Sequence, residues 1–122
     1  MIKLIPWSDA AERGLVVSAG EDMAIIKNQV LNGVAQLWEH NLNGTHGFIV
    51  TRLDVEGLGT ELVLVLGEGS GLNEAVPLFK QVAADMGINS IRVHVKRKGL
   101  IRMFSRHDFE VEMYVLRSRL NG

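Results

Sequence analysis

The stretch ELVLVLGEGSGLNEAVPLFKQVAADMGINSIRVHV, residues 61–95, decides the fold of this chain. Residues 61–66 are almost wholly aliphatic, which is typical of a strand that is buried on both faces at the centre of a sheet. A glycine-rich turn at 67–71 leads into a helix that is expected to end near Met86 and Gly87. Residues 91–95 alternate apolar and polar side chains and predict a second strand. Because a right-handed helical crossover joins the two strands, we expect them to lie parallel.

The residues before this stretch predict two helices and two more strands. Residues 2–5 form a short apolar strand, and Ser8 is the expected N-cap of a helix over residues 9–17. Residues 22–37 place apolar side chains at three- and four-residue spacing, which predicts a second helix. A turn at 41–47 then precedes a strand that reaches residue 55.

The residues after the stretch predict a short helix and a last strand. The helix is expected from about Gly99 to Arg106. Residues 109–116 follow, where Val111, Met113 and Val115 alternate with acidic or aromatic side chains, as in an edge or hairpin strand. Such an edge offers a pairing surface to a second copy of the chain, so a homodimer is compatible with the sequence.

Composition excludes several classes of protein. A chain of 122 residues with 47% hydrophobic content holds one core, so we expect a single domain over residues 1–122. It has no cysteine, and His40, His46 and His107 lack metal-ligand spacing, so neither a disulfide framework nor a metal site is expected. Its N-terminal apolar piece is too short for a signal peptide or membrane span, which favours a soluble cytoplasmic protein.

The basic residues of this chain are concentrated in one segment, although its net charge is close to zero. The formal net charge is -1, yet eight of the thirteen basic residues lie between Arg92 and Arg119. A small nucleic-acid-binding domain that uses this basic segment is one interpretation, but overall neutrality makes nucleic acid an unlikely partner.

The turn Gly67-Glu68-Gly69-Ser70-Gly71 has the ingredients of an anion site. Backbone N–H groups at a helix N-terminus converge there with the helix dipole, and glycine lets a phosphate approach closely. The simpler interpretation is that these glycines only close a turn. Pro77 lies inside the predicted helix, so Asn73 is an alternative N-cap a little beyond the glycines.

This turn resembles the pyrophosphate-binding motif of the GNAT acyl-CoA N-acyltransferases. That motif reads arginine or glutamine, two residues, glycine, one residue, then glycine or alanine. Gly69 and Gly71 match its glycines, whereas Leu66 replaces the basic or amide residue and Glu68 adds a negative charge. The likeness covers roughly residues 47–120, in the order of helices and strands. In its compact, divergent form the chain resembles GNAT proteins encoded by bacteriophages.

The resemblance implies a fold and an activity. The fold is α/β (α+β), with a mixed central sheet that is mostly antiparallel, contains a parallel splayed strand pair and is flanked by helices. The activity is direct acyl transfer, most simply from acetyl-CoA to a primary amine, with backbone N–H groups of strand 61–66 polarising the thioester carbonyl. The acyl-CoA contacts would then come from residues 66–71 (Leu66, Gly67, Glu68, Gly69, Ser70 and Gly71), with Arg97 and Arg102 on the phosphates.

The catalytic positions depart from the family pattern. The family commonly protonates the departing thiolate with a tyrosine, and the matching position here is Phe104, which has no proton to donate. Ser105 and Tyr114 are therefore the candidate proton donors. Glu61 and His94, on the two central strands, are the candidate general bases. Each of these side chains also has the simpler interpretation of an ordinary strand or surface residue.

The altered positions leave a second interpretation open. A non-catalytic GNAT-like accessory or structural protein would keep the fold without the catalytic groups. Leu66 in place of the family's basic or amide residue, and Phe104 in place of its tyrosine, fit such a protein. Binding of acyl-CoA without turnover distinguishes that protein from an enzyme.

Overall fold

The computed structural model describes residues 2–56, 59–68, 72–95 and 98–120. Five strands and four α-helices follow one another along the described chain, with a short 3₁₀ helix between the first two α-helices. Their bounds, in chain order, are β1 Ile2–Leu4, α1 Asp9–Ala19, η1 Gly20–Asp22, α2 Met23–Leu31, β2 Ala35–Leu42, β3 Thr45–Glu56, β4 Gly59–Glu68, α3 Leu72–Asp85, β5 Ser90–Val93 and α4 Lys98–Ser105.

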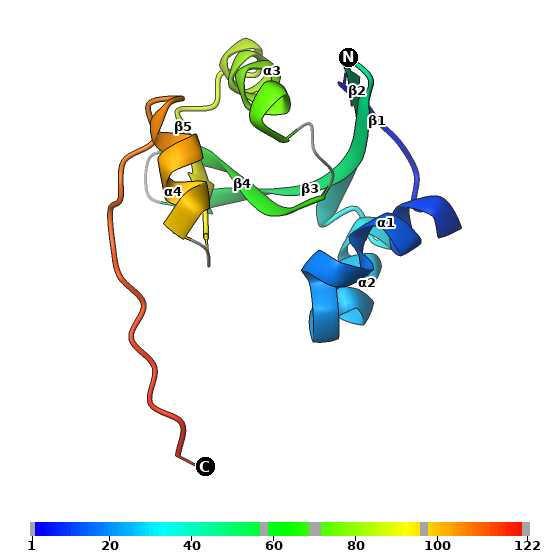
Figure 1. Ribbon diagram of the computed structural model, residues 1–122, viewed down its shortest axis with the longest axis horizontal. Helices are drawn as coiled ribbons and strands as arrows, with labels where there is room; N and C mark the ends of the chain where they lie inside the picture. Colours follow the sequence, from blue (N-terminus) through cyan, green and yellow to red (C-terminus); the bar gives the residue numbers. More distant parts are fainter. Residues whose placement is uncertain (1, 57–58, 69–71, 96–97, 121–122) are drawn as a thin grey trace.

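The strands form one mixed sheet in the order β1-β2-β3-β4-β5 (Figure 1). The first four strands pair antiparallel, and β5 pairs with β4 in parallel. This arrangement confirms the predicted α/β class with a mostly antiparallel sheet and one parallel pair, because α3 crosses over between β4 and β5.

The two faces of the sheet carry separate apolar layers. On one face, Leu15 of α1 and Ile26 of α2 pack against Leu37 and Val50 of the strands. On the other face, side chains of α3 and α4 pack against Ile49, Leu62 and Leu64 of the strands. The helix residues of this second layer are Ala75, Val76, Phe79, Ala83 and Phe104. The burial on both faces of β3 and β4 explains why residues 61–66 are almost wholly aliphatic.

The first helix begins where the sequence predicts it. The Ser8 side chain accepts a 3.1 Å hydrogen bond from the Ala11 amide and satisfies one of the unpaired N–H groups of the first turn. The helix continues to Ala19, and Gly20 follows with φ 53°, a left-handed conformation that glycine adopts without strain.

The predicted helix over residues 22–37 is wrong in its second half. α2 ends at Leu31, and residues 35–37 belong to β2 instead. Gly33 has φ 76°, the Gly33 amide bonds to the Val30 carbonyl, and the Val34 amide bonds to the Gln29 carbonyl, which together close the helix. The apolar spacing runs on past Gly33 because Val34, which is exposed, and Leu37, which is buried in β2, happen to keep the helical interval.

The predicted turn at 41–47 is shorter in the structure. β2 runs to Leu42 and β3 begins at Thr45, so only Asn43 and Gly44 form the connection. Both have positive φ, 52° and 80°, which is the two-residue hairpin that an Asn-Gly pair favours. Likewise, α3 begins at Leu72 and holds Pro77 inside it, so Asn73 lies in the first turn and is not the N-cap.

The predicted last strand over residues 109–116 is also wrong. A turn at 106–108 ends α4, and residues 109–119 form neither helix nor strand. Figure 1 shows this segment running away from the body of the molecule. Alternation alone makes no strand, because a strand needs a neighbour to accept its backbone hydrogen bonds, and the described residues provide none here.

None of the helices in the described ranges is both long and apolar enough to cross a membrane.

Candidate functional site

The parallel pair β4 and β5 separates partway along its length. The ladder between them covers four residue pairs and stops at Leu64 and Val93. On the other side of β4, Val50 of β3 lies opposite Leu66 while Thr51 lies opposite Leu64, so Val65 is an extra residue on β4. Such a bulge bends the strand that carries it and increases its local twist. The backbone of β4 beyond Leu64 therefore has an edge toward β5 that the ladder leaves open.

A buried hydrogen-bonded chain holds β3 at this bulge. The hydroxyl of Thr51, which is fully buried, accepts a 2.8 Å hydrogen bond from the Trp38 indole and donates a 3.0 Å bond to the Gln36 side chain. The Trp38 ring also packs edge-on against Phe79 of α3, with ring centroids 5.2 Å apart. These contacts fix the register of β2 and β3 beside the point where β4 takes its extra residue.

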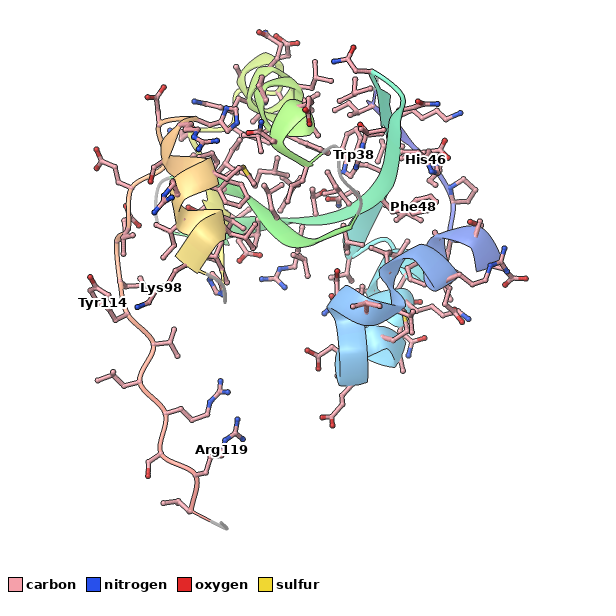
Figure 2. All side chains as sticks on the ribbon, in the orientation of Figure 1. Trp38, His46, Phe48, Lys98, Tyr114 and Arg119 are labelled. Atoms are coloured by element: carbon pink, nitrogen blue, oxygen red, sulfur yellow. The ribbon has the colours of Figure 1, made fainter. Side chains whose placement is uncertain are left out.

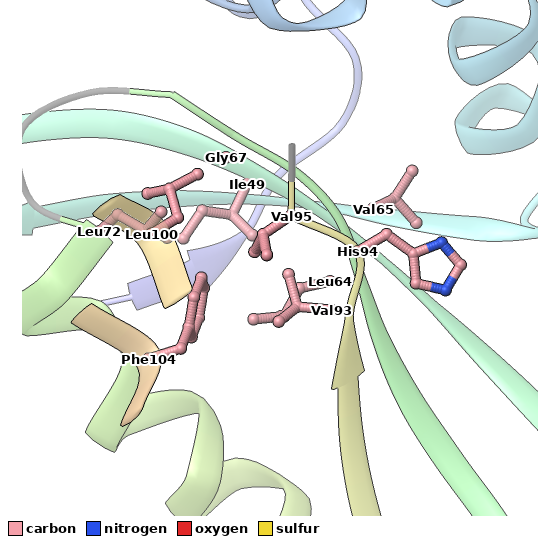
Figure 3. A pocket seen from close by; sticks show the side chains of 10 residues that line it. All are labelled: Ile49, Leu64, Val65, Gly67, Leu72, Val93, His94, Val95, Leu100 and Phe104. Atoms are coloured by element: carbon pink, nitrogen blue, oxygen red, sulfur yellow. The ribbon is translucent and has the colours of Figure 1, made fainter. Parts of the chain in front are cut away.

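An apolar cavity of about 90 Å³ lies where the two strands part (Figure 3). Its walls come from β3, from the diverging ends of β4 and β5, and from α3 and α4. The lining residues are Ile49, Leu64, Val65, Gly67, Leu72, Val93, His94, Val95, Leu100 and Phe104. Apolar walls beside an open strand edge suit a ligand that has an apolar group next to one carbonyl.

Phe104 of α4 is buried in the wall of this cavity, 4% exposed. Its ring packs against Phe109 with centroids 5.1 Å apart. The residue that the sequence aligned with the family's proton donor therefore lies at the splayed strands, but as a phenyl ring.

The two hydroxyls proposed as substitutes do not reach the cavity. Ser105 is exposed, and its hydroxyl donates to the carbonyl of Ile101 within α4 at 2.8 Å. Tyr114 is 86% exposed and lies on the C-terminal segment, away from the splayed strands (Figure 2). Neither lines the cavity, so both stay sequence predictions that this geometry does not support.

The two candidate bases lie at opposite ends of the paired part of β4 and β5. Glu61 precedes Leu64 by three residues, which is roughly 10 Å along a strand. Both of its carboxylate oxygens are engaged, with Arg92 at 3.1 Å and with the Ser90 hydroxyl at 3.1 Å. His94 lines the cavity, and Figure 3 shows its ring pointing away from the apolar side chains around it.

Arg92 joins three strands on the face that carries α1 and α2. One of its Nη atoms contacts Asp54 of β3 at 2.8 Å, and the other contacts Glu61 of β4. Asp54 also receives the Arg52 guanidinium at 2.8 Å, and this arginine, followed by Arg92, holds the pKa of Asp54 below its ordinary value. In the sequence, only the polar alternation of Arg52 and Asp54 signals this network, and it does not reveal the partners on the neighbouring strands.

The predicted phosphate-binding turn lies largely outside the described residues. This applies to Gly69, Ser70 and Gly71, to Arg97, and to the side chains of Leu66 and Glu68. Gly67 is described, and a Cβ placed on it would come within 3.1 Å of the Leu72 side chain at the start of α3. Arg102 is exposed in the last turn of α4. The phosphate contacts therefore stay a prediction.

Metal ligands do not cluster in the part of the chain that is described. Within it, no three His, Asp or Glu side chains are grouped closely enough to hold an ion.

Comparison by sequence finds no relative: no family model matches the chain, and no curated protein matches it. Comparison by structure finds acetyltransferases. A probable acetyltransferase superposes with a TM-score of 0.74 at 10% identity, covering 98% of this chain and 96% of the other. A ribosomal-protein-alanine N-acetyltransferase from Brucella melitensis biovar Abortus gives 0.66 at 16% identity, with 97% and 99% covered. An aminoglycoside acetyltransferase from an uncultured soil metagenomic sample gives 0.68 at 10% identity, with 99% and 96% covered. The mixed sheet, its parallel β4 and β5, and the flanking helices are those of the GNAT acetyltransferase fold.

Proposed function

We propose that this protein is an acyl-CoA-dependent N-acyltransferase that transfers an acetyl group from acetyl-CoA directly to a primary amine. The observation that carries the proposal is the apolar cavity between β4 and β5, next to a strand edge that the ladder leaves open. The acetyltransferase fold of the structural neighbours supports it.

The chain offers each part of an acyl-CoA a suitable environment. The apolar walls formed by Leu64, Val93 and Leu100 suit the acyl group and the adjoining thioester and exclude water from them. The sequence motif at 67–71, which lies largely outside the described residues, stays the candidate for the pyrophosphate beside the N-terminus of α3, because the first turn of a helix and its dipole favour anions. Arg102, exposed on α4, is the further candidate for a phosphate contact.

The transfer step uses the backbone of β4 and one side chain. The amine nitrogen attacks the thioester carbonyl carbon, and N–H groups of β4 beyond Leu64 stabilise the oxyanion that forms. The C–S bond then breaks, the amide forms, and the thiolate departs with the bonding electron pair. The proton that the attacking nitrogen loses passes to a base.

We assign that base to His94 rather than Glu61. His94 borders the cavity with its ring pointing away from the apolar wall, so it would take the proton through one water. Glu61 lies about three residues away along β4 with both oxygens bound by Arg92 and Ser90. A general base must come within hydrogen-bond reach of the proton it takes, directly or through one water. His94→Gln should then lower kcat by about a hundredfold or more with little change in the affinity for acetyl-CoA. Glu61→Gln is the matched control, and a larger loss of kcat in that variant would overturn the assignment.

The test of the whole proposal is ligand binding followed by turnover. CoA and acetyl-CoA should raise the melting temperature, because a ligand at 100 times its Kd stabilises the folded state by about 2.7 kcal/mol. The double variant Gly69→Val, Gly71→Val should lose this shift. The control is Gly99→Val, since the space around a Cβ at Gly99 is open. Acetylation of an amine panel, read by mass spectrometry, completes the test.

A non-catalytic CoA-binding module is the second candidate, and the buried Phe104 in the cavity wall favours it. A thermal shift with acetyl-CoA but no acetylated amine would select this second candidate. No shift with either ligand would remove both.

A further inference from the structure

The end of β4 lines the cavity with Val65 and Gly67, and the described residues give it no paired strand toward β5. The parallel ladder stops before it, at Leu64 and Val93. A backbone segment that is paired on one side only has fewer hydrogen bonds to hold it than the middle of a sheet has. Contacts from the neighbouring helices therefore contribute to where this segment lies.

Gly67 is held from both faces of the sheet. On the face of α1 and α2, the Ser18 hydroxyl donates a 3.2 Å hydrogen bond to the Gly67 carbonyl, although the two residues are 49 positions apart. On the face of α3 and α4, the Leu72 side chain lies so close that a Cβ on Gly67 would come within 3.1 Å of it (Figure 3). A planar peptide group that is fixed at its carbonyl is also fixed at the N–H of the next residue. The two helices therefore set the direction in which the chain leaves β4.

A close approach of α1 to the sheet brings Ser18 into reach of this carbonyl. A Cβ at Gly14 would lie 2.7 Å from the Phe48 ring, which is closer than a side chain can pack, so the position of the helix depends on a glycine. Gly14 and Ser18 are four residues apart and therefore lie on the same face of α1. Phe48 lies opposite Glu68, the residue that follows Gly67 on β4. The glycine contact and the serine hydrogen bond thus place one face of α1 over the region where β3 begins and β4 ends.

We propose that Ser18 is a positioning residue for acyl-CoA, because its hydroxyl fixes the peptide group after Gly67 at the point where β4 enters the candidate pyrophosphate turn. This inference rests on the proposed function for the identity of the ligand. The Ser18 hydrogen bond is exposed, so its loss costs the fold little, since water then satisfies both groups. A backbone that is already held in place loses less freedom when a ligand binds, and the benefit appears as affinity. Ser18 therefore acts on acyl-CoA binding and leaves the transfer step unchanged.

Isothermal titration calorimetry with CoA and with acetyl-CoA tests this role. Ser18→Ala should raise the Kd of both ligands about threefold to tenfold, the factor that one neutral hydrogen bond gives. The KM for acetyl-CoA should rise similarly, while kcat changes by less than about twofold. Ser18→Thr keeps a hydroxyl and should restore the Kd, and the matched control Val17→Ala alters an exposed neighbour on α1. An unchanged Kd in Ser18→Ala, or a loss in kcat alone, overturns the assignment.

Gly14→Ala tests whether the approach of α1 acts through the same hydrogen bond. The added methyl group meets the Phe48 ring and moves α1 away from the sheet, so the Kd for CoA should also rise. In the double variant with Ser18→Ala, the loss of affinity should be smaller than the product of the two separate losses, because both changes remove one hydrogen bond. A loss equal to the product would overturn the link between the helix position and the hydrogen bond.

Hydrogen exchange in the ligand-free protein tests the Ser18 contact without acyl-CoA. The backbone amides of residues 65–68 should exchange at least about threefold faster in Ser18→Ala than in the unaltered chain, because opening this segment then costs less free energy. Val17→Ala should exchange as the unaltered chain does. Unchanged exchange at the end of β4 in Ser18→Ala overturns the positioning role even if acetyl-CoA binds. Failure of the proposed function has a different signature, since the unaltered chain would then bind neither CoA nor acetyl-CoA, and the assignment of Ser18 to acyl-CoA would fail with it.

Discussion

Replacement of Thr51 by valine tests whether the hydrogen-bonded chain at the bulge holds the sheet together. Valine keeps the shape of threonine but has no hydroxyl, so the Trp38 indole loses its acceptor and the Gln36 side chain loses its donor. Thr51 is fully buried, so water cannot replace the lost hydroxyl at that position. A buried donor left without a partner costs about 1–3 kcal/mol, and a replaceable hydrogen bond about 0.5–1.5 kcal/mol.

We expect the free energy of unfolding to fall by about 2 kcal/mol, since the half-buried Trp38 indole and the half-buried Gln36 side chain each lose a hydrogen bond to Thr51, at about 0.5–1.5 kcal/mol apiece. Urea denaturation followed by tryptophan fluorescence measures it. Thr45→Val is the control, because the Thr45 hydroxyl bonds to the Leu42 carbonyl at the half-exposed hairpin and should cost less.

A double-mutant cycle with Trp38→Phe isolates the indole bond. In the Trp38→Phe background, Thr51→Val should cost less by about 0.5 kcal/mol or more, as expected for residues in direct contact. Because Thr51 lies opposite Leu64 at the mouth of the splayed strands, the single variant should also weaken acetyl-CoA binding. A loss of stability below about 0.5 kcal/mol, together with additive variants, would refute this account of the bulge.

Three further outcomes follow from the structure. Phe79→Ala should lower the free energy of unfolding by about 3–5 kcal/mol, because Phe79 is 1% exposed and packs on Trp38, and a chemical denaturation curve gives the value. Arg52 and Arg92 lower the pKa of Asp54, so this carboxylate contributes stability at neutral pH that is lost as the pH falls through its folded-state pKa. Urea titrations at decreasing pH should show that loss, and Asp54→Asn should reduce it. Phe104→Tyr should raise kcat of an active enzyme by about a hundredfold if the added hydroxyl reaches the thiolate, and steady-state kinetics with an amine substrate measures the change.

Local sequence chemistry predicted much of the architecture. The aliphatic run at 61–66, the helix after the glycines and the alternation at 91–95 predicted the parallel pair correctly, because each pattern depends on burial within one element. The same kind of evidence failed at Gly33, where a helix cap and a new strand keep the helical spacing by coincidence. The pattern of alternation after Phe109 also gave a wrong prediction. Alternation indicates which side chains are apolar enough to be buried, but it does not indicate whether a neighbouring strand is present.

The candidate site depended on the tertiary structure much more than on the sequence. Among the predicted residues, His94 and Gly67 line the cavity, and Phe104, noted only for its missing hydroxyl, forms part of its wall. The cavity exists because Val65 is an extra residue on β4, and a bulge is a property of the register between two strands that no single strand encodes. In the same way, Glu61 looked like a free carboxylate until folding brought Arg92, thirty-one positions later, against it.

The sequence by itself determined which segments become buried strands and helices, since burial follows from side-chain periodicity. Only the tertiary structure decided where the strands part and which charges are paired, because both depend on contacts between residues that are distant along the chain.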